Sequence, residues 1–366
     1  APNAPSISTL ITNDTSPVIT GTATLISGES LSLLINGVTY TNIPVVSNNW
    51  SLDTGTAVAA SGTFSALTDN TYSLTATSTD TAGNMTTDIT SNELIIDTVA
   101  PTVPTINALV TNDLTPTITG SAALFAGEKL SITVNGATYN EVPTNSNIWS
   151  VDTGLLNPNT GALGSFTDGS TYEVVATATD IAGNSAVDTS SNEITIDNTP
   201  PTAPTVDILV TNNPAPTLSG TSPSGVGEVL SVVFNGATFD NVAVSSNAWT
   251  LDTATTIPTS GSLGTLVDGS SYEVVATVTD SANLLTSDVT SNEVTFDQTG
   301  PDALLAPDMT AETDRGQFDN DDITSDNTPS IMGSCTNTDT ITLYVDSSST
   351  TATFDCVYSL YTITTA

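Results

Sequence analysis

The sequence contains no histidine and almost no basic residues. Its 366 residues include 2 Lys+Arg against 39 Asp+Glu, which gives a formal net charge of −37. Without imidazole there is no histidine general base and no histidine ligand for zinc. The two basic residues, Lys129 and Arg315, are too few to form a surface that holds nucleic acid or anionic lipid. No residue pattern resembles a nucleophile with its base, so we expect neither an enzyme nor a nucleic-acid partner.

Cysteines and long apolar runs are also scarce. Cys335 and Cys356 are the only cysteines, and in an exported protein they can form a disulfide, with two free buried thiols as the alternative. No apolar run approaches the roughly 18–20 residues that cross a bilayer. No signal-like stretch precedes Ala1. We therefore expect a mature or excised portion of a secreted or cell-surface protein, without membrane insertion of its own.

A period of about 100 residues organises the sequence. Asn-Gly pairs begin at Asn36, Asn135 and Asn235, with spacings of 99 and 100 residues (135−36 and 235−135). Tryptophans recur with the same two spacings (149−50 and 249−149). About 100 residues is the size of a two-sheet β-sandwich. The predicted domains, called the first to fourth repeats below, are residues 1–99, 100–199, 200–299 and 300–366.

Within each repeat the hydrophobic pattern has a period of two. Leu31, Leu33 and Ile35 alternate with residues that face the other way, and the later repeats share this pattern. Such alternation predicts strands with one buried face. Each Asn-Gly pair predicts a hairpin turn, and a tyrosine after an Asp-Gly or Asp-Asn turn predicts a corner where its phenol bonds back to the main chain. With about seven short strands per repeat and no helical pattern, we predict an all-β chain of antiparallel β-sandwiches.

The second repeat carries the clearest family resemblance. Residues 168–184 read Asp-Gly-x-x-Tyr-x-Val-x-Ala-Thr-x-Thr-Asp-x-Ala-Gly-Asn, followed by a strand that ends at Asp197 and a Pro-rich step. This pattern resembles the bacterial Ig-like repeats of large surface adhesins of the biofilm-associated and RTX types. The resemblance implies tandem Ig-like domains arranged as an elongated rod, export, and junctions stiffened by calcium. The third repeat lacks the glycine of Ala-Gly-Asn and has Asn283-Leu284 instead, which leaves the geometry of that loop open.

The fourth repeat is short. Only 66 residues follow position 300 (366−300). The last predicted strands reach residues 354–364, and no counterpart of the tyrosine strand or the closing strand follows them. Its acidic segment, residues 302–329, resembles the linker and first strands of the same adhesin repeats. We expect a truncated repeat. The alternative is that a neighbouring chain supplies the missing strands, because an open sheet edge accepts an added strand.

Acidic residues recur at the repeat boundaries. If the first strand of a sandwich runs away from the incoming linker, the loops that hold Glu128 and Asp180 return to the pole beside Asp97. Three carboxylates with loop carbonyls and water supply roughly six to eight hard oxygens, which suits calcium. The same reasoning applies to the next boundary and to the acidic segment of the fourth repeat. The candidate calcium ligands are Asp97, Glu128, Asp180, Asp197, Glu228, Asp280, Asp297, Asp314 and Asp322.

Turn chemistry is the alternative interpretation for each of these acids. An Asp beside Gly can form an Asx-turn, and a Glu after Gly can be a solvated loop tip. We favour the turn for Asp69, Asp168 and Asp268, and calcium for the aspartates that enter Pro-rich linkers. The acidic segment of the fourth repeat lacks EF-hand spacing, and a solvated hinge is its alternative.

These observations favour a structural role, as an extracellular stalk or fibre segment of a bacterial surface protein. Two alternatives stay open: a subunit of a self-assembling filament, and modules that themselves bind a glycan or a partner surface. The single tryptophan of each of the first three repeats favours a core or pole-capping position over a sugar platform, which needs several aromatics. The expected partners are further repeats or copies of the chain and a host or neighbouring cell surface.

Overall fold

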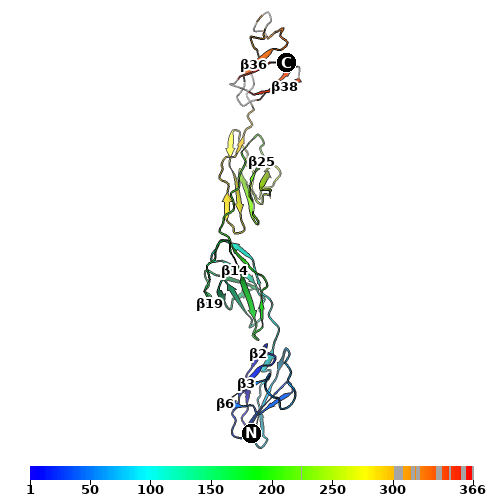
Figure 1. The fold of residues 1–366 in the computed structure, drawn as a ribbon, viewed down its shortest axis with the longest axis vertical. Helices are drawn as coiled ribbons and strands as arrows, with labels where there is room; N and C mark the ends of the chain where they lie inside the picture. The colour runs from blue at the N-terminus through cyan, green and yellow to red at the C-terminus, as the bar shows by residue number, and fades with distance from the viewer. Residues whose placement is uncertain are drawn as a thin grey trace. The chain divides into compact units, whose positions relative to one another are not determined.

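The computed structural model describes residues 1–223, 225–300, 308–314, 318, 322–334, 340–345, 348–355 and 360–364. Every regular element among these residues is a β-strand (Figure 1). The all-β prediction is therefore confirmed. No helix in this part of the chain is long and apolar enough to cross a membrane.

The first repeat consists of eleven strands in three sheets. The strands are β1 (Ser6–Ile7), β2 (Leu10–Thr12), β3 (Val18–Thr22), β4 (Ser30–Ile35), β5 (Val38–Thr41), β6 (Val45–Val46), β7 (Asn49–Asp53), β8 (Asn70–Tyr72), β9 (Thr75–Thr79), β10 (Met85–Thr87) and β11 (Leu94–Ile96). The sheet orders are β1-β3-β7-β6, β10-β9-β4-β5 and β2-β11-β8. The strands are more numerous and shorter than the seven predicted, because several edge segments pair over only two or three residues.

The second repeat has the same plan. Its strands are β12 (Thr105–Ile106), β13 (Leu109–Thr111), β14 (Thr117–Ser121), β15 (Lys129–Val134), β16 (Ala137–Tyr139), β17 (Thr144–Asn145), β18 (Ile148–Asp152), β19 (Thr160–Gly161), β20 (Thr171–Tyr172), β21 (Val174–Thr179), β22 (Ser185–Val187) and β23 (Ile194–Ile196). The sheet orders are β12-β14-β18-β17, β13-β23-β20 and β19-β16-β15-β21-β22.

The third repeat also forms three sheets, and the described part of the fourth forms two. The third contains β24 (Leu209–Thr211), β25 (Thr217–Thr221), β26 (Val229–Phe234), β27 (Ala237–Phe239), β28 (Val244–Ser245), β29 (Ala248–Asp252), β30 (Ser260–Gly261), β31 (Ser270–Tyr272), β32 (Val274–Thr279), β33 (Leu285–Ser287) and β34 (Val294–Phe296). Its sheets are β24-β34-β31, β25-β29-β28 and β30-β27-β26-β32-β33. The fourth contains β35 (Asp308–Met309), β36 (Ser330–Ser334), β37 (Thr340–Val345), β38 (Ser348–Asp355) and β39 (Leu360–Thr364), in sheets β35-β36-β39 and β37-β38.

One pairing in each of the first three repeats is parallel rather than antiparallel. In the first repeat β2 runs parallel to β11, with Leu10 opposite Leu94 and Thr12 opposite Ile96. The pairs β13–β23 and β24–β34 repeat this arrangement. A strand near the start of the repeat thus ends beside the strand that closes the repeat. This places the residues after both strands at the same pole.

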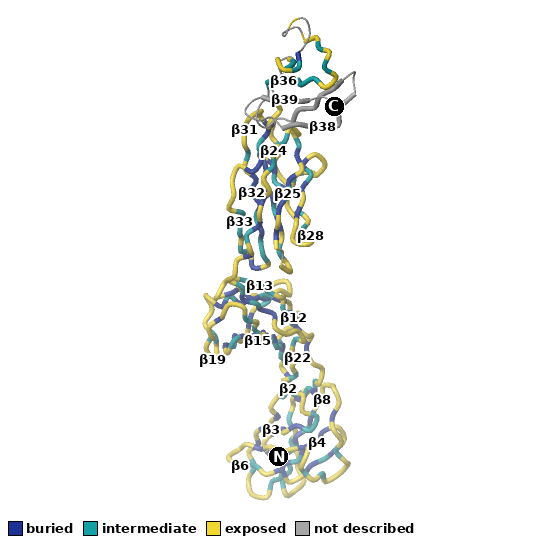
Figure 2. Tube along the Cα trace, turned by 45° about the horizontal axis from the view of Figure 1, so that its top comes forward, coloured by how far each residue is buried: buried dark blue, intermediate teal, exposed yellow. Residues whose placement is uncertain are grey.

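Each of the first three repeats has its own hydrophobic core, as the buried segments of Figure 2 show. The predicted alternation is confirmed on β4, where Leu31, Leu33 and Ile35 are at most 1% exposed. The matching residues of β15 and β26 are buried in the same way. The Asn-Gly turns adopt positive φ at both residues, +44° and +81° at Asn36 and Gly37, as a two-residue hairpin requires.

The tryptophan of each of the first three repeats lies in the core. Trp149 is 1% exposed, and its indole N–H donates to Thr105 O at 3.2 Å. The ring packs on Gly120 of the neighbouring strand, where a Cβ would overlap Thr105 O and lie 2.5 Å from the ring. Only glycine fits between the ring and the backbone of β12. The predicted core position is therefore confirmed over a sugar platform.

The predicted tyrosine corner is also present. The Tyr72 hydroxyl donates to Thr68 O at 2.9 Å. In the next two repeats, the phenol oxygens of Tyr172 and Tyr272 accept the N–H groups of Thr167 and Val267 at 2.8 and 2.6 Å. These bonds fix the turn that precedes the closing half of each sandwich.

The chain divides into two compact units. One comprises Ala1–Pro201 with Thr279–Leu285, and the other comprises Thr202–Val278 with Thr286–Ala366. Both the first and the second repeat therefore belong to one unit, together with a loop of the third repeat.

Candidate functional site

The loop between β21 and β22, residues 180–184, is a turn built around one carboxylate. The Asp180 N–H donates to Asn184 O at 3.0 Å, and the Asn184 N–H donates back to Asp180 Oδ1 at 2.8 Å. Gly183 has φ +95°, a conformation that side chains disfavour. The Asp and Gly of the motif therefore both serve the turn itself.

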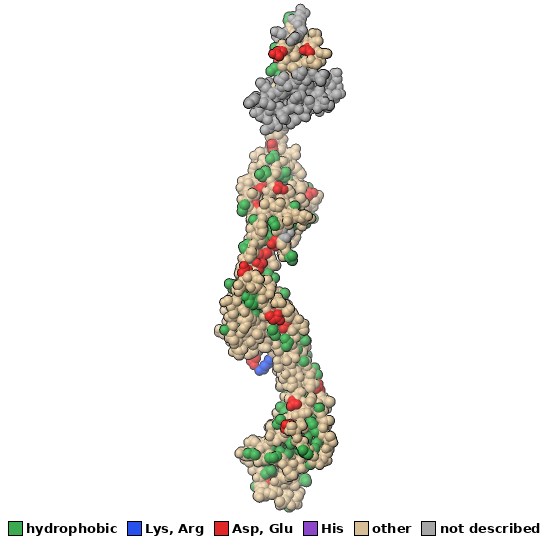
Figure 3. Space-filling model, viewed as in Figure 1, with side chains coloured by type: hydrophobic (Ala, Val, Ile, Leu, Met, Phe, Trp, Pro, Cys, Tyr) green, Lys and Arg blue, Asp and Glu red, His purple; other side chains and the backbone are tan. Residues whose placement is uncertain are grey.

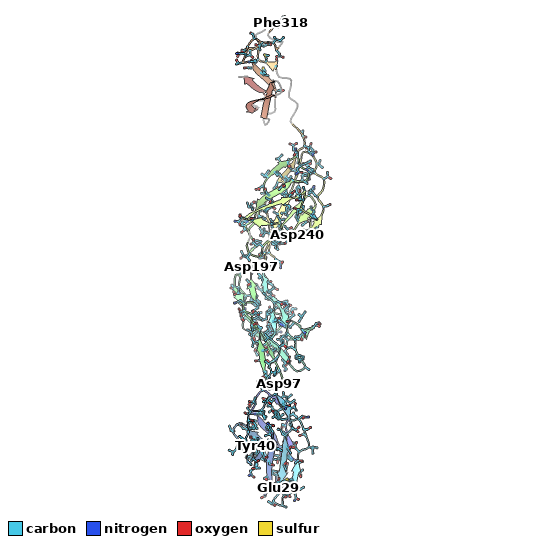
Figure 4. The ribbon with its side chains drawn as sticks, turned by 90° about the vertical axis from the view of Figure 1, so that its right-hand side faces the viewer. Glu29, Tyr40, Asp97, Asp197, Asp240 and Phe318 are labelled. Atoms are coloured by element: carbon cyan, nitrogen blue, oxygen red, sulfur yellow. The ribbon has the colours of Figure 1, made fainter. Side chains whose placement is uncertain are left out.

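Asn184 extends this turn to the preceding repeat. Its amide Nδ2 donates to Asp180 Oδ2 and to the Asp97 carbonyl oxygen, both at 2.8 Å. The Asn13 N–H also donates to Ala182 O at 3.0 Å. Asp97 directly follows β11 of the first repeat (Figure 4). A loop of the second repeat thus forms hydrogen bonds with two residues of the first.

The parallel pairing of β2 with β11 explains why these two residues lie together. Because Thr12 is opposite Ile96, the chain leaves both strands at the same level. The Asp97 N–H donates to Thr12 O at 3.0 Å, which holds Asp97 beside the segment that contains Asn13. Two segments separated by more than 80 residues in sequence therefore form one docking surface for the loop 180–184.

Glu128, the third acid predicted at this boundary, holds its own turn. Its Oε2 accepts the Phe125 N–H at 2.8 Å. The turn lies against the loop 180–184, because a Cβ on Gly127 would collide with Cδ1 of Ile181. In the described residues, Asp97, Glu128 and Asp180 do not bring three ligand oxygens within 4.8 Å of one another.

The matching loop of the third repeat keeps the backbone but loses the amide. The Asp280 N–H donates to Leu284 O at 3.1 Å, and Asn283 takes φ +64° in place of Gly183. Asparagine tolerates the left-handed region, so the question that the sequence left open is answered: the turn is retained. Leu284 provides no side-chain donor, and the buried Asp280 Oδ2 has no hydrogen-bond partner in the described residues.

The remaining predicted acids of the first three repeats take part in local turns. The Oδ1 atoms of Asp97, Asp197 and Asp297 accept the N–H of the residue two positions later at 2.9–3.0 Å. Glu228 Oε2 accepts the Gly225 N–H at 2.7 Å and lies in the second compact unit.

The aspartates assigned to turns also hold the linkers. Asp268 Oδ1 accepts the Gln298 N–H at 2.6 Å, and its Oδ2 accepts the Thr299 hydroxyl at 2.8 Å. These two hydrogen bonds, led by the Gln298 N–H, lower the pKa of Asp268 from its ordinary 3.8. Asp69 and Asp168 hold residues 98 and 198 in the same way. These aspartates do more than form turns, because they also fix the chain where it leaves the sandwich.

In the fourth repeat three aspartates lie together. Asp314 is 3% exposed; its Oδ2 accepts the Asp322 N–H at 3.4 Å, and its Oδ1 has no partner in the described residues. A hydrogen bond with the Asp322 carboxyl raises the pKa of Asp308, and the charges of Asp322 and Asp314 add to this effect. The predicted pair Asp314 and Asp322 is thus brought together with Asp308. Arg315 and the two cysteines of the predicted disulfide, Cys335 and Cys356, lie outside the described residues.

Basic charge is rare on the described surface. Lys129 Nζ donates to Glu141 Oε1 at 2.6 Å, and this bond lowers the pKa of Glu141. Figure 3 shows the acidic side chains of one face in red, in small groups among uncharged surface. In the part of the chain that the structure describes, carboxylates therefore have main-chain amides, hydroxyls and side-chain amides as donors much more often than basic side chains.

A buried glutamate before the closing strand is the feature that the sequence prediction missed. Glu93, Glu193 and Glu293 are at most 4% exposed. Each accepts one main-chain N–H through Oε2, at 2.9–3.0 Å, while Oε1 has no partner in the described residues. In the third repeat, Glu293 forms a group with Glu273 and Asp288 whose ligand atoms all lie within 4.8 Å of one another, so these residues could hold a metal ion. The signal was a glutamate in the same place in three repeats, directly before the apolar closing strand.

No family model matches the sequence, and no curated protein matches it. Among solved structures, a segment of a 1.5-MDa bacterial ice-binding adhesin, studied for host cell surface retention, is 22% identical over 81% of this chain and 99% of its own, with a TM-score of 0.30. The SGBP-B protein of the Bacteroides ovatus mixed-linkage glucan utilization locus, bound to a heptasaccharide, is 14% identical over 80% and 70%, with a TM-score of 0.20. The FN1–FN3 domains of chicken CNTN1 are 12% identical over 79% and 98%, with a TM-score of 0.29. At these TM-scores the likenesses carry no argument about function.

Proposed function

We propose that this chain is a stalk segment of an extracellular bacterial surface protein, in which Ig-like repeats are joined by hydrogen-bonded junctions rather than by free linkers. The observation that carries the proposal is the Asn184 side chain, which donates to Asp180 of its own repeat and to Asp97 of the preceding one. A segment that transmits position or force along a chain needs contacts of this kind between consecutive domains.

The main chain supports the same proposal. The Asn13–Ala182 hydrogen bond adds a contact that does not depend on side chains. Asp69, Asp168 and Asp268 tie down the first linker residues after the closing strands. Between the first and second repeats, the Asp69 bond and the Asn13–Ala182 bond restrict the chain on both sides of the linker, so the freedom of the second repeat relative to the first is reduced.

Calcium stiffening of the junctions is the second part of the proposal. A carboxylate has about four lone-pair sites, so the two hydrogen bonds to Asp180 leave capacity for a cation. A calcium ion on Asp97 and Asp180 would contact both repeats. In the fourth repeat the buried Asp314 lies beside Asp308 and Asp322, and its Oδ1 has no partner in the described residues, which suits the same cation. Bound cations would also relieve the self-repulsion of a chain with a net charge of −37.

Small-angle X-ray scattering of the full chain, with calcium and with a chelator, tests this function. We expect an extended, well-defined particle in calcium and a broader distribution of dimensions with the chelator, while circular dichroism shows unchanged β-structure. Identical extended profiles in both conditions would contradict the calcium part. A flexible particle in both conditions would contradict the stalk itself.

A further inference from the structure

We propose that the third repeat contains a calcium site of its own, formed by Glu273, Asp288 and Glu293. The site is separate from the junctions between repeats and does not depend on the stalk function. Its three residues come from the place where the chain passes from one sheet to another. Glu273 separates β31 from β32, Asp288 directly follows β33, and Glu293 directly precedes β34.

The spacing of the ligand atoms fits one hard cation. One carboxylate oxygen from each residue lies within 4.8 Å of the other two. Calcium binds oxygen at roughly 2.3–2.6 Å, so two oxygens on one ion are separated by at most about 5 Å. The three carboxylates therefore reach a single calcium ion without rearrangement of the backbone.

Glu293 shows independently that a partner is needed. It is 2% exposed; its Oε2 accepts the Val274 N–H at 3.0 Å, and its Oε1 has no hydrogen-bond partner in the described residues. A buried charged oxygen without a partner is costly, because it loses its hydration and gains nothing in return. A cation held among these three carboxylates supplies the missing interaction.

The main chain orients the other two ligands. Glu273 Oε2 accepts the Asn292 N–H at 2.9 Å, and Asp288 Oδ1 accepts the Ala276 N–H at 2.8 Å. These bonds fix the carboxylates before an ion arrives, which reduces the entropic cost of binding. Glu273 is exposed and Asp288 half-buried, so the site is open to water on one side. Water can complete the six to eight oxygens that calcium takes.

The first two repeats provide internal controls. In the second repeat Glu173, Asp188 and Glu193 make the same three hydrogen bonds, at 2.8, 2.7 and 2.9 Å. In the first repeat Ser73 stands at the position of Glu273, and its hydroxyl accepts the Asn92 N–H at 3.2 Å. The first repeat thus keeps two carboxylates of the set and lacks the third. In the described residues, only the third-repeat set brings its three ligand oxygens within 4.8 Å of one another. We therefore expect calcium to bind the third repeat most tightly, the second more weakly and the first most weakly.

Hydrogen exchange of the full chain, measured by mass spectrometry with and without calcium chloride, tests this site locally. We expect calcium to slow exchange of residues 286–296 by about tenfold at a calcium concentration ten times the dissociation constant. Glu273→Gln should abolish this slowing in the third repeat and leave residues 186–196 responsive. Glu273 is exposed, so this variant does not threaten folding as a change at Glu293 would.

Two further variants complete the test. Glu173→Gln should abolish the calcium response of residues 186–196 and leave residues 286–296 responsive. Ser73→Glu should create a calcium response at residues 86–96. The proposal is overturned if calcium leaves residues 286–296 of the unaltered chain unchanged, or if the Glu273→Gln chain responds as before. A response at the junction residues 180–185 alone would support calcium stiffening and contradict this site.

Discussion

The loops 180–184 and 280–284 have the same backbone but differ in one donor. In the second repeat, Asn184 satisfies Asp180 and reaches Asp97 with a single amide group. In the third repeat, Leu284 occupies this position, and the buried Oδ2 of Asp280 has no partner in the described residues. The motif therefore has two separable parts. Asp with Gly or Asn at positive φ makes the turn, and the last asparagine makes the contact between repeats.

Asn184→Leu, which copies the third repeat, should have the largest effect. It removes two 2.8 Å hydrogen bonds, one of them to an ionised carboxylate, so we expect a loss of roughly 2–3 kcal/mol in the opening free energy of the loop. Hydrogen exchange of residues 180–185 measures this loss. Asn84→Leu is the matched control, because Asn84 makes the same bonds to Asp80 in the first repeat. Unchanged hydrogen exchange of residues 180–185 in the Asn184→Leu chain would show that the Asn184 amide does not stabilise the loop.

Gly183→Ala tests the part that makes the turn. The φ of +95° should cost alanine about 1–2 kcal/mol, although a Cβ there meets nothing closer than Asn13 Nδ2 at 3.8 Å. Gly183→Asn should be nearly neutral, because Asn283 holds the same place at +64°. Chemical denaturation of the two variants measures the difference. Equal losses for Ala and Asn would argue against backbone strain as the cause.

Leu284→Asn should repair the third repeat. A side-chain amide that reaches Asp280 Oδ2, which has no partner in the described residues, is expected to stabilise the loop by about 1 kcal/mol. Thermal denaturation of the third repeat measures this gain, with Leu285→Asn on the neighbouring exposed residue as the control. A gain from the control as large as from Leu284→Asn would assign the effect to polarity alone.

Acid should weaken the amide-closed loop of the first repeat slightly. The Asn84 side-chain amide, followed by the Asn84 N–H, lowers the pKa of Asp80 from 3.8. A carboxyl with a lowered pKa in the folded state stabilises the fold above pH 3.8, and this contribution is lost as the pH falls through the lower folded value. Titration of the Asp80 carboxyl carbon by NMR should show the lowered pKa, and Asn84→Leu should return it towards 3.8. A pKa that does not respond to this substitution would contradict the assigned cause.

The opposite titration is expected in the fourth repeat. The Asp322 carboxyl raises the pKa of Asp308 above 3.8, so the folded state holds this proton more tightly than the unfolded chain. Stability from this group is therefore present at low pH and is lost as the pH rises through the raised value. Asp322→Asn should remove most of the rise in the pKa of Asp308 measured by NMR titration, leaving the smaller effect of the Asp314 charge. A pKa of Asp308 that stays equally raised in this variant would point to another neighbour.

Much of the fold follows from local sequence rules. The alternation of Leu31, Leu33 and Ile35 and the turn at Asn36 depend on residues that are neighbours in sequence, and both are present as predicted. The parallel pairing of β2 with β11 joins segments about 84 residues apart (94−10), and no local pattern indicates it.

The candidate sites were harder to predict because their geometry depends on such distant contacts. The sequence placed acids at the boundary but could not show that Asn184 makes the bond to Asp97. It singled out none of the trio in the third repeat, because only the fold turns the Glu293 carboxylate back to the Val274 N–H and beside Glu273 and Asp288.

The distance between the first and second repeats, measured by pulsed electron spin resonance, tests the central claim most directly. Spin labels would be placed at the exposed positions Ser51 on β7 and Ser150 on β18 by substitution with cysteine, with Cys335 and Cys356 changed to serine. In calcium we expect one narrow distance distribution. A chelator should broaden it moderately, and the Asn184→Leu substitution should broaden it more. A broad distribution in the unaltered chain with calcium, or equal widths with and without Asn184, would contradict a junction held by this residue.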